Sequence, residues 1–446
     1  MYAGIRDLWR LQGLDAARFD SESWNPLGDV VRPGDRVVVK PNLICQENWD
    51  RPGSWQEVIT HPAVVRAVVD YILLALRGDG EVVICDGPQT DSDFDALVES
   101  SGYGALIDWY REHGQPVRLL DLRRERWFAR GGVTERKESL PGDPEGYVSV
   151  DLAEDSAFAT YALSGRFYGA DYDMEETRRF HADGRHEYVL CRTPMTADVF
   201  VNVPKLKTHK KTGVTLSLKN LVGINGYRNC LPHHTLGSPE EGGDEFPDRS
   251  VKRKLESGSI QAFKKLLARL GGTGGAWARA VKAAGRRVFG DTSEVVRSGN
   301  WYGNDTTWRM VMDLNRILLW FDGQGRPTDA PRRYLSIVDG IIGGEGNGPL
   351  APDPVGAGIL VAGTNPWAVD WVAAEEMGLD PRRIPLLARP AQDEERFAWL
   401  LPEGAPRPAV EGSRRAGWRP FRPHFGWVKV LESPGDPASA GQQVTR

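Results

Sequence analysis

The runs Arg36-Val-Val-Val-Lys40 and Glu81-Val-Val-Ile-Cys-Asp86 decide the fold class of this chain. Neither run alternates apolar with polar residues, which is typical of strands that are buried on both faces of a sheet. Between them, Thr60-His61-Pro62 predicts a helix start with Thr60 as the N-cap, and the apolar residues of 64–73 keep helical spacing. A strand, a helix and a strand in this order predict a parallel α/β sheet.

The same alternation of strands and helices continues along the chain. Ser92 or Asp93 is predicted to cap a helix that ends near Gly102, and residues 116–121 form the next predicted strand. Further strands are predicted at residues 199–203, 335–339 and 358–363, and further helices from Asn304-Asp305 and from Asn365-Pro366. We therefore expect an α/β protein: a mostly parallel sheet with flanking helices, a ligand cleft at the C-terminal ends of the strands, and two insertions.

Shifts in composition divide the chain into segments. We expect an N-terminal α/β part, an insertion, a central basic motif segment, a basic helical insertion, a C-terminal α/β part and a disordered tail, at residues 30–122, 123–195, 196–250, 251–300, 301–432 and 433–446 respectively. The first insertion loses the alternation and is interpreted as antiparallel structure. The second is rich in lysine and arginine, and a solvated lid or surface hairpin is favoured there over a patch for nucleic acid or for a membrane surface.

The overall composition is that of a globular protein, with 40% apolar and 26% charged residues in a chain of 446. A net charge of -5 disfavours nucleic-acid binding by the protein as a whole. No apolar run reaches the roughly 20 residues that span a bilayer, and no signal-peptide pattern is present. The four cysteines are far apart, without the spacing of a zinc or iron–sulfur site. These features predict a cytoplasmic protein with reduced thiols and no membrane partner.

Positive charge is concentrated after Asp198, and no aspartate or glutamate follows before Glu240. Lys205, Lys207 and His209 come directly after a predicted strand, and we assign them to a loop. Lysines in a partly buried cleft attract carboxylate or phosphate groups. The alternative is a solvated basic loop, because surface lysines are commonplace.

Polar residues also follow other predicted strands. Because the carboxyl ends of parallel strands meet at one edge of a sheet, we expect these side chains to line one cleft. The predicted substrate-binding residues are Lys40, Asn42, Asp86, Lys205, Lys207, His209 and Asn347. The expected ligand and partner is a small anionic metabolite, and nucleic acid is disfavoured.

The candidates for acid–base catalysis are Lys219, His233 and Glu345. Residues 213–223, around Lys219, fit either a helix or a strand, and in a helix Thr215 shares a face with Lys219. Glu345 lies in the glycine-rich run 343–348, which fits either a loop whose backbone N–H groups approach a phosphate or carboxylate or a mobile turn. Within such a loop Glu345 is a candidate acid or base.

Two histidines, His209 and His233, are also candidates for a metal site. Histidine is a common ligand of transition metals, but the spacing here matches no standard zinc pattern. The alternative for both is an acid–base or anion-binding role. The cofactor is therefore open, with a transition metal as one candidate.

Six stretches carry a resemblance to a known family: Lys40-Pro-Asn-Leu, Thr60-His-Pro, Asp198-Val-Phe-Val-Asn-Val-Pro-Lys-Leu-Lys-Thr-His, Thr212-Gly-Val-Thr-Leu-Ser-Leu-Lys-Asn-Leu-Val-Gly, Asp339-Gly-Ile-Ile-Gly-Gly-Glu-Gly-Asn-Gly-Pro and Gly363-Thr-Asn-Pro-Trp-Ala-Val-Asp. They occur in order over residues 37–385, and the chain resembles the family filed as domain of unknown function number 362. This resemblance implies a known family without a known reaction. Some members carry ferredoxin-like iron–sulfur modules, but this chain has no iron–sulfur cluster motif, which argues against a bound cluster.

The central stretch is also similar, more faintly, to the nickel-pincer lactate racemases. In those enzymes a Pro-His pair, a lysine that holds the cofactor and a later Asn-His pair follow one another. Here His209, Lys219 and His233 stand in comparable order, with Thr208 and Pro232 in place of the residues that precede the histidines. The similarity implies a version of the site in which Lys219 and a histidine hold a metal cofactor.

Our leading interpretation is an enzyme acting on a small anionic metabolite that Lys205, Lys207 and His209 bind. Two alternatives stay open. One is a metal-cofactor enzyme with racemase- or isomerase-like chemistry, and the other is a non-catalytic binding or redox-partner protein.

Overall fold

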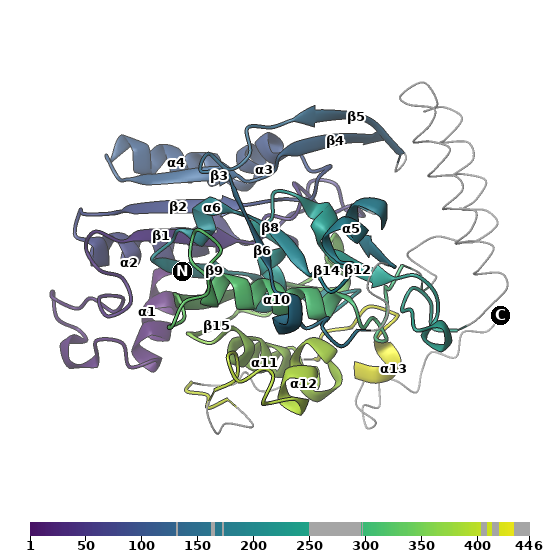
Figure 1. Ribbon diagram of the computed structural model, residues 1–446. Helices are drawn as coiled ribbons and strands as arrows, with labels where there is room; N and C mark the ends of the chain where they lie inside the picture. The colour runs from purple at the N-terminus through teal and green to yellow at the C-terminus, as the bar shows by residue number, and fades with distance from the viewer. Residues whose placement is uncertain are drawn as a thin grey trace.

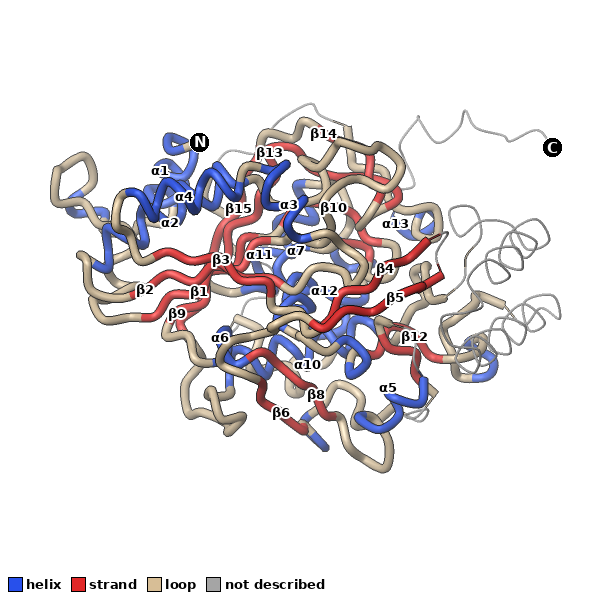
Figure 2. The backbone as a smooth tube through the Cα atoms, turned by 90° about the horizontal axis from the view of Figure 1, so that it is seen from above, coloured by secondary structure: helices blue, strands red, loops and turns tan. Residues whose placement is uncertain are grey.

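The computed structural model describes residues 1–130, 133–161, 166–171, 174–248, 296, 298–402, 408–412 and 419–431. Most of the basic insertion expected at 251–300, and all of the tail expected at 433–446, lie outside these described residues. The described part is an α/β protein, as the strand pattern predicts, with helices on both faces of a central sheet (Figure 1, Figure 2).

The central sheet has nine strands within the described residues and is mostly parallel. Its strands are β1 (Arg36–Pro41), β2 (Glu81–Asp86), β3 (Val117–Asp121), β9 (Val199–Val203), β10 (Lys205–His209), β11 (Gly213–Val214), β13 (Arg333–Asn347), β14 (Ala351–Val355) and β15 (Ile359–Gly363). The order is β11-β10-β13-β9-β1-β2-β3, and β14 and β15 also pair with β13. Only the pairs β10–β11, β13–β14 and β13–β15 are antiparallel among the described ladders of this sheet. This topology confirms the predicted fold class.

Each central strand is buried on both faces. In β1, Val38 belongs to one hydrophobic core, whereas Val37 and Val39 belong to the other core, on the opposite face of the sheet. All three side chains have 0% exposure. Full burial of a valine side chain stabilises the fold by about 1.5–3 kcal/mol, which explains why three valines follow one another here.

The helices lie on either side of this sheet (Figure 1). They are α1 (Tyr2–Leu11), α2 (Pro62–Leu76), α3 (Phe94–Ser101), α4 (Tyr103–Glu112), α5 (Met174–Phe180), α6 (Arg192–Met195), α7 (Leu216–Asn220), α10 (Thr307–Trp320), α11 (Pro366–Glu376), α12 (Pro385–Gln392) and α13 (Val428–Leu431). The ambiguous segment 213–223 contains α7, so its helical interpretation holds for residues 216–220, and β11 occupies residues 213–214.

Helix starts agree with the sequence signals to within about two residues. The N-caps predicted at Asp93 and Asn365 are present, each accepting a hydrogen bond from the backbone three residues later. The cap of α2 is His61 rather than Thr60, because His61 Nδ1 accepts a hydrogen bond from Ala63 N at 3.1 Å. α10 begins two residues after its expected start.

The residues expected to form a loop after β9 are instead a strand. The chain from Val199 to Lys205 runs along β13 in one constant register, from Arg333 to Asp339, and a register shift follows before Lys207. The loop assignment is therefore wrong. The backbone bonds to β13 and β11, which the sequence does not reveal, make this polar segment β10.

The glycine-rich run 343–348 is likewise not a loop over most of its length. Residues 343–347 form the second half of β13 and pair with β14 in an antiparallel ladder. A Cβ at Gly344 would lie 2.7 Å from the carbonyl oxygen of Glu57. Close packing against a neighbouring segment thus explains this glycine better than a phosphate-binding loop.

In the part of the chain that the structure describes, three two-stranded antiparallel sheets flank the central one. They pair β4 (Glu125–Arg130) with β5 (Val133–Ser139), β6 (Tyr147–Asp151) with β8 (Glu187–Cys191), and β7 (Phe167–Gly169) with β12 (Pro232–Thr235). Because β7 pairs with β12, part of the segment 123–195 packs directly on the end of the central basic stretch.

Candidate functional site

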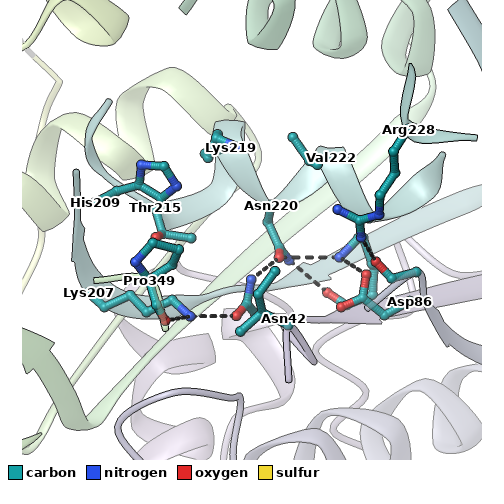
Figure 3. Close-up of a pocket in the computed structure, with 14 residues that line it drawn as sticks. Asn42, Asp86, Lys207, His209, Thr215, Lys219, Asn220, Val222, Arg228 and Pro349 are labelled. Atoms are coloured by element: carbon teal, nitrogen blue, oxygen red, sulfur yellow. Dashed lines mark hydrogen bonds and ion pairs between the residues drawn. The ribbon is translucent and has the colours of Figure 1, made fainter. Parts of the chain in front are cut away.

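A cavity of about 40 Å³ lies at the carboxyl ends of β1 and β2, beside β10 and α7 (Figure 3). One water molecule needs about 10–15 Å³ of such space, so the cavity holds a few waters or one small chemical group. It is lined by Lys40, Asn42, Ile44, Asp86, Gly87, Lys207, His209, Thr215, Lys219, Asn220, Val222, Gly223, Arg228 and Pro349. The carboxyl edge is where open parallel sheets bind ligands.

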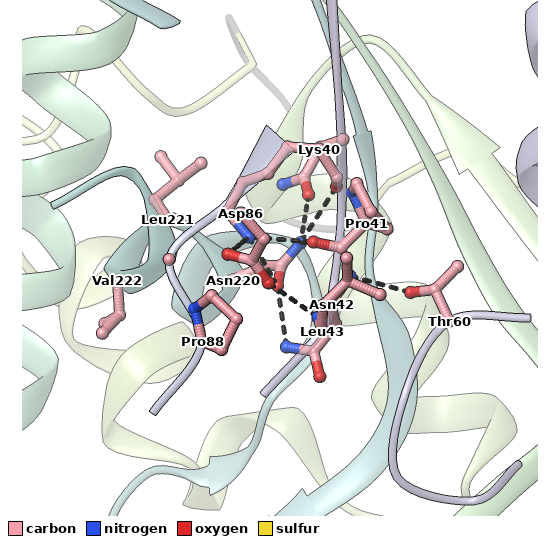
Figure 4. A network of polar contacts seen from close by, with 12 residues as sticks. Lys40, Pro41, Asn42, Leu43, Thr60, Asp86, Pro88, Asn220, Leu221 and Val222 are labelled. Carbon is pink, nitrogen blue, oxygen red and sulfur yellow. Dashed lines mark hydrogen bonds and ion pairs between the residues drawn. The ribbon is translucent and has the colours of Figure 1, made fainter. Parts of the chain in front are cut away.

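Lys40 and Asp86 form a buried ion pair in the wall of this cavity. Lys40 Nζ and Asp86 Oδ1 are 2.7 Å apart, and the two side chains are 0% and 4% exposed. Lys40 Nζ also donates to Pro41 O at 2.9 Å, and Asp86 Oδ2 accepts from Leu43 N at 2.6 Å (Figure 4). The two charges neutralise each other, so neither is available to a ligand.

Asn220 of α7 joins this pair to the neighbouring strands (Figure 4). Its Oδ1 accepts hydrogen bonds from Asn42 Nδ2 at 2.8 Å and from Lys40 Nζ at 3.2 Å. Its Nδ2 donates to Asn202 Oδ1 at 2.7 Å. Asn42 Oδ1 in turn accepts from Lys207 Nζ at 2.9 Å. One continuous network therefore fixes side chains of β1, β9, β10 and α7 relative to one another.

Lys207 is fully buried and has no carboxylate partner among the described residues. Its Nζ donates to Asn42 Oδ1 at 2.9 Å, to Val58 O at 2.5 Å and to Pro349 O at 3.3 Å. Three neutral acceptors match the three N–H groups of an ammonium, although burial lowers the pKa of Lys207 to about 7. Lys207 therefore gives the cavity positive charge but no spare donor.

Lys219 is different, because its amine is buried without any bond. The residue is 7% exposed, and Nζ forms neither a hydrogen bond nor an ion pair within the described part of the chain. Burial, followed by the charges of Arg228, Lys211 and Lys207, lowers the pKa of Lys219 to about 7. Near neutral pH this amine is present in both forms, so it can accept or donate a proton.

Thr215 brings a hydroxyl group to the same cavity (Figure 3). The residue is 3% exposed, and Oγ1 has no hydrogen-bond partner in the part of the chain that the structure describes. A buried hydroxyl without a partner costs about 1–3 kcal/mol. A bound ligand with an oxygen atom in the cavity would remove that cost.

The turn between Thr215 and Lys219 is strained, and hydrogen bonds to a residue of α11 stabilise it. Leu216, the first residue of α7, has a φ of 46°, in the left-handed region that disfavours a side chain. Asp370 stabilises this turn: Oδ1 accepts from Ser217 N at 2.7 Å and Oδ2 from Leu218 N at 2.9 Å. These bonds satisfy the first N–H groups of α7 and so set its direction.

Two neutral histidines, His209 and His233, lie near enough to Lys219 for its charge to act on them. His209 Nδ1 accepts from Lys211 N at 3.1 Å, so its ring proton is on Nε2. His233 Nδ1 is 2.9 Å from Leu231 O and must donate, which leaves Nε2 as an acceptor. Burial and then the charge of Lys219 place the pKa of both rings well below the ordinary value. Only the ring of His209 lines the cavity, where it offers a donor.

Arg228 completes the positive lining. Its Nη2 donates to Gly87 O and to Pro88 O, the latter at 2.5 Å, while Nε and Nη1 have no hydrogen-bond partner among the described residues. Burial lowers the pKa of Arg228, and Asp171 and Asp86 oppose this effect without forming an ion pair with it. A guanidinium stays protonated in proteins, so Arg228 is a fixed cation with free donors.

Comparison with known proteins identifies the family. Residues 37–140 and 143–375 match the model of a family described as Domain of unknown function (DUF362). The chain belongs to the DUF362 family. It is 25% identical over 362 residues to the thylakoid-associated protein sll1697 of Synechocystis sp. (strain ATCC 27184 / PCC 6803 / Kazusa), an alignment that covers 81% of this chain and 69% of that protein. No solved structure matches this DUF362 chain.

Six of the predicted site residues line the cavity of this DUF362 protein: Lys40, Asn42, Asp86, Lys207, His209 and Lys219. Lys205 lies elsewhere, since its Nζ is 2.8 Å from Asp339 Oδ2 in an ion pair with exposures of 1% and 0%. Asp339 Oδ2 also accepts from the backbone N of His61 at 2.8 Å. Lys205 therefore ties β10 and β13 to the start of α2.

Glu345 and Asn347 lie in the ladder between β13 and β14, outside the lining of the cavity. Glu345 accepts hydrogen bonds from Arg419 at 2.7 and 2.8 Å and from Arg422 N at 2.8 Å. Burial raises the pKa of Glu345, but the contacts with Arg419 and Arg422 outweigh it and hold the pKa below its ordinary value. The carboxylate is thus engaged in joining β13 to the segment 419–431.

Three lining residues with polar side chains are absent from the sequence-based site: Thr215, Asn220 and Arg228. A signal existed for Thr215, because the helical interpretation of 213–223 puts it on one face with Lys219. Asn220 has no such signal, since its role depends on partners from β1 and β9 that are remote in sequence. Arg228 belongs to the basic stretch, but the carbonyls that orient it follow β2.

Three further observations concern metal binding, the cysteines and membrane-spanning helices. No three His, Cys, Asp or Glu side chains gather as a metal-binding group in the described residues. The four cysteines are free and buried. Within the described ranges, no helix combines the length and the apolar character that crossing a bilayer requires.

Proposed function

We propose that this DUF362 protein is an enzyme that binds the anionic group of a small metabolite in the cavity beside α7. In this proposal Lys219 exchanges a proton with the substrate, and the lining cations hold the anion. One observation carries it: the cavity has uncompensated positive charge. Lys207, Lys219 and Arg228 have no ion-pair partner among the described residues, and Asp86 is already neutralised by Lys40.

Burying unpaired cations is costly, so such a cluster is unfavourable unless an anion joins it. An anion in the cavity meets free donors from Lys219, Arg228, Thr215 and the Nε2–H of His209. These donors come from three separate segments of the chain, which supports a built binding site rather than a run of solvated lysines.

The proton-transfer part of the proposal rests on Lys219. Within the described residues its amine has no bond to hold it in one protonation state, and burial brings its pKa to about 7, the range that suits a general acid or base at neutral pH. The charge of Lys219 acts on His233, which has an unprotonated Nε2. It is the second candidate for receiving a proton.

Isothermal titration of the full chain with small carboxylates and phosphates tests the binding step. Wild type is expected to bind at least one of these anions, and Lys219→Gln is expected to weaken that binding at least tenfold. Arg382→Gln removes one charge from an arginine that is 78% exposed and outside the cavity, and should change nothing. Absence of binding by every anion would overturn the proposal.

The catalytic step is tested by NMR in D₂O. A carbon acid bound beside Lys219 should exchange its acidic hydrogen for deuterium with wild type, and not with Lys219→Gln. Exchange that persists in Lys219→Gln at saturating ligand would remove Lys219 from the proton transfer. Tight binding of anions without any turnover would instead support the non-catalytic binding protein.

The metal-cofactor enzyme remains a second candidate because His209, Lys219 and His233 interact electrostatically with one another. His233 has the unprotonated Nε2 that a ligand needs, and Lys219 is the free amine that would hold the group. A bound transition metal would supply Lewis-acid chemistry beside the cavity. Elemental analysis of protein purified without a tag should then find a stoichiometric transition metal, and its absence would reject this candidate.

A further inference from the structure

We infer that the anionic group held in the cavity is a phosphoryl group, and that Thr215 is a specificity-determining donor to one of its oxygens. This inference rests on the proposed function and narrows it from anions in general to one chemical class. It depends on the size of the cavity, its uncompensated charge and the donors that have no partner.

The size limits what can enter. The cavity of about 40 Å³ accommodates a few water molecules at about 10–15 Å³ each. Only one compact group of the ligand fits there, so two carboxylates on a carbon chain could not both be enclosed. The charges of the lining must then be balanced by a single group.

The charge of the lining exceeds that of one carboxylate. Lys207, Lys219 and Arg228 have no ion-pair partner among the described residues, and Lys40 is neutralised by Asp86. A carboxylate brings one negative charge, whereas a phosphomonoester brings about 1.5 to 2 near pH 7. A phosphoryl group is the compact group that leaves the least positive charge unbalanced.

The number of free hydrogen-bond donors also favours a phosphoryl group. Lys219 Nζ, Arg228 Nε and Nη1, Thr215 Oγ1 and His209 Nε2 all lack a hydrogen-bond acceptor within the described part of the chain. Lys219 and Thr215 extend from the region of α7, and Arg228 approaches from the opposite end of the cavity (Figure 3). A tetrahedral group with three terminal oxygens offers more acceptor positions, in more directions, than the two oxygens of a planar carboxylate, which have about four lone-pair sites in one plane.

Thr215 is the residue whose state is least explained without a ligand. Thr215 is 3% exposed and lines the cavity, and its Oγ1 has no hydrogen-bond partner among the described residues. Lys219 and Arg228 attract any anion, but a hydroxyl group at a fixed position favours an anion with an additional oxygen there. Thr215 therefore distinguishes the phosphoryl group from a carboxylate.

Isothermal titration of the full chain at pH 7.0 and constant ionic strength tests this inference with methyl phosphate, inorganic phosphate and acetate. Methyl phosphate or inorganic phosphate should bind at least tenfold more tightly than acetate. Tighter binding of methyl phosphate would identify a phosphomonoester, and tighter binding of inorganic phosphate would identify the free ion. Equal affinity for acetate would overturn the inference and leave the proposed function standing, whereas no binding of any anion would overturn both.

Variants at Thr215 test the specificity role. Thr215→Val keeps the shape but removes the hydroxyl, and should weaken binding of the preferred phosphate about tenfold while changing acetate binding less than twofold. Thr215→Ser restores the hydroxyl and should bind within about threefold of wild type. If Thr215→Val retained full affinity, or weakened both ligands equally, the assignment of Thr215 would fail. The ligand comparison on wild type stays decisive if the valine variant does not fold.

Discussion

Lys40 Nζ and Asp86 Oδ1 are 2.7 Å apart at the carboxyl ends of two adjacent strands, and this pair decides the charge of the cavity beside it. Asp86 is the acidic residue among the lining side chains, and it is occupied. Residues at the carboxyl ends of β1 and β2 thus neutralise each other, while Lys207, Lys219 and Arg228 have no such partner within the described residues.

Replacing one member of this pair should destabilise the protein strongly. Asp86→Asn leaves the ammonium of Lys40 buried and uncompensated, and we expect the free energy of unfolding to fall by about 3–5 kcal/mol. Urea unfolding followed by circular dichroism measures the change. Arg382→Gln is the matched control, because it breaks a pair with Asp380 in which the arginine is 78% exposed, and should leave the free energy of unfolding almost unchanged. A similar loss in both variants would contradict the buried pair.

The close approach of Gly223 to this pair gives a second prediction. A Cβ at Gly223 would lie 1.8 Å from Asp86 Oδ1 and 2.8 Å from Lys40 Nζ, and Asp86 is held by Leu43 N. Gly223→Ala must therefore displace the pair, and we expect loss of anion binding together with about 2 kcal/mol or more of stability. Titration and urea unfolding measure both effects.

Gly356, directly after β14, offers a control for this substitution. A Cβ at Gly356 would meet no heavy atom within 4 Å, so Gly356→Ala should keep anion affinity and lose less than about 1 kcal/mol. Unchanged binding in Gly223→Ala would show that the cavity does not need the pair in its present position.

The fold could be predicted further from the sequence than the site. Residues 36–40, 81–86 and 199–203 were recognisable as strands because burial on both faces requires uninterrupted apolar residues. Residues 205–209 are polar, so the same rule assigns them to a loop. Their strand conformation depends on β13, more than a hundred residues away in the sequence, and no local pattern contains that information.

The residues of the site, too, could be predicted only in part from local sequence patterns. Lys205 and Lys207 look equivalent in the sequence, but the register shift between them sends Lys207 into the cavity and leaves Lys205 beside Asp339. In the predicted loop, Glu345 is a reasonable catalytic acid. In the structure it lies in a strand and forms an ion pair with Arg419. Which polar residues find partners is decided by tertiary packing, and only unpartnered ones remain for a ligand.

Anion binding should depend on pH through the buried lysines. Burial and neighbouring cations lower the pKa of Lys219 to about 7 in the free protein, and a bound anion favours the ammonium and raises that pKa. A group whose pKa is higher in the complex supports binding fully below its free pKa, and the support is lost as pH rises. Sulfate does not titrate in this range, so only the lysines change their charge. The affinity for sulfate should be highest near pH 6. Above pH 7 it should fall about tenfold per pH unit if one proton is taken up on binding, and about a hundredfold if two are.

Lys207 also has a pKa of about 7, so one or two protons accompany binding in wild type. Lys219→Gln should bind more weakly and take up one proton fewer, whereas Arg382→Gln should match wild type. Titrations between pH 6 and 9, in buffers with different ionisation enthalpies, count these protons. An affinity for sulfate that stays constant over this range would exclude the lysines as its binding groups.

A pair of buried histidines in the segment 123–195 should make the protein sensitive to acid. His181 and His186 are 0% and 3% exposed, with their Nδ1 atoms 3.4 Å apart, and His181 Nε2 donates to Cys230 O at 2.7 Å. Burial lowers the pKa of His181 to about 3 and that of His186 to about 4. The unfolded chain therefore binds more protons below pH 6.5, and folding stability is complete above that pH and lost as pH falls toward 4.

The expected size of this acid sensitivity is about 2 kcal/mol per histidine between pH 7.5 and pH 5.0, since each unit of pH below 6.5 costs about 1.4 kcal/mol. His181→Gln retains a donor for the Cys230 carbonyl but cannot take up a proton. Its urea-unfolding free energy should therefore lose about 2 kcal/mol less than wild type over the same change in pH, whatever its stability at pH 7.5. Because the comparison is a difference of differences, packing changes at His181 cancel, and equal losses in the two proteins would show that His181 is not held neutral by the fold.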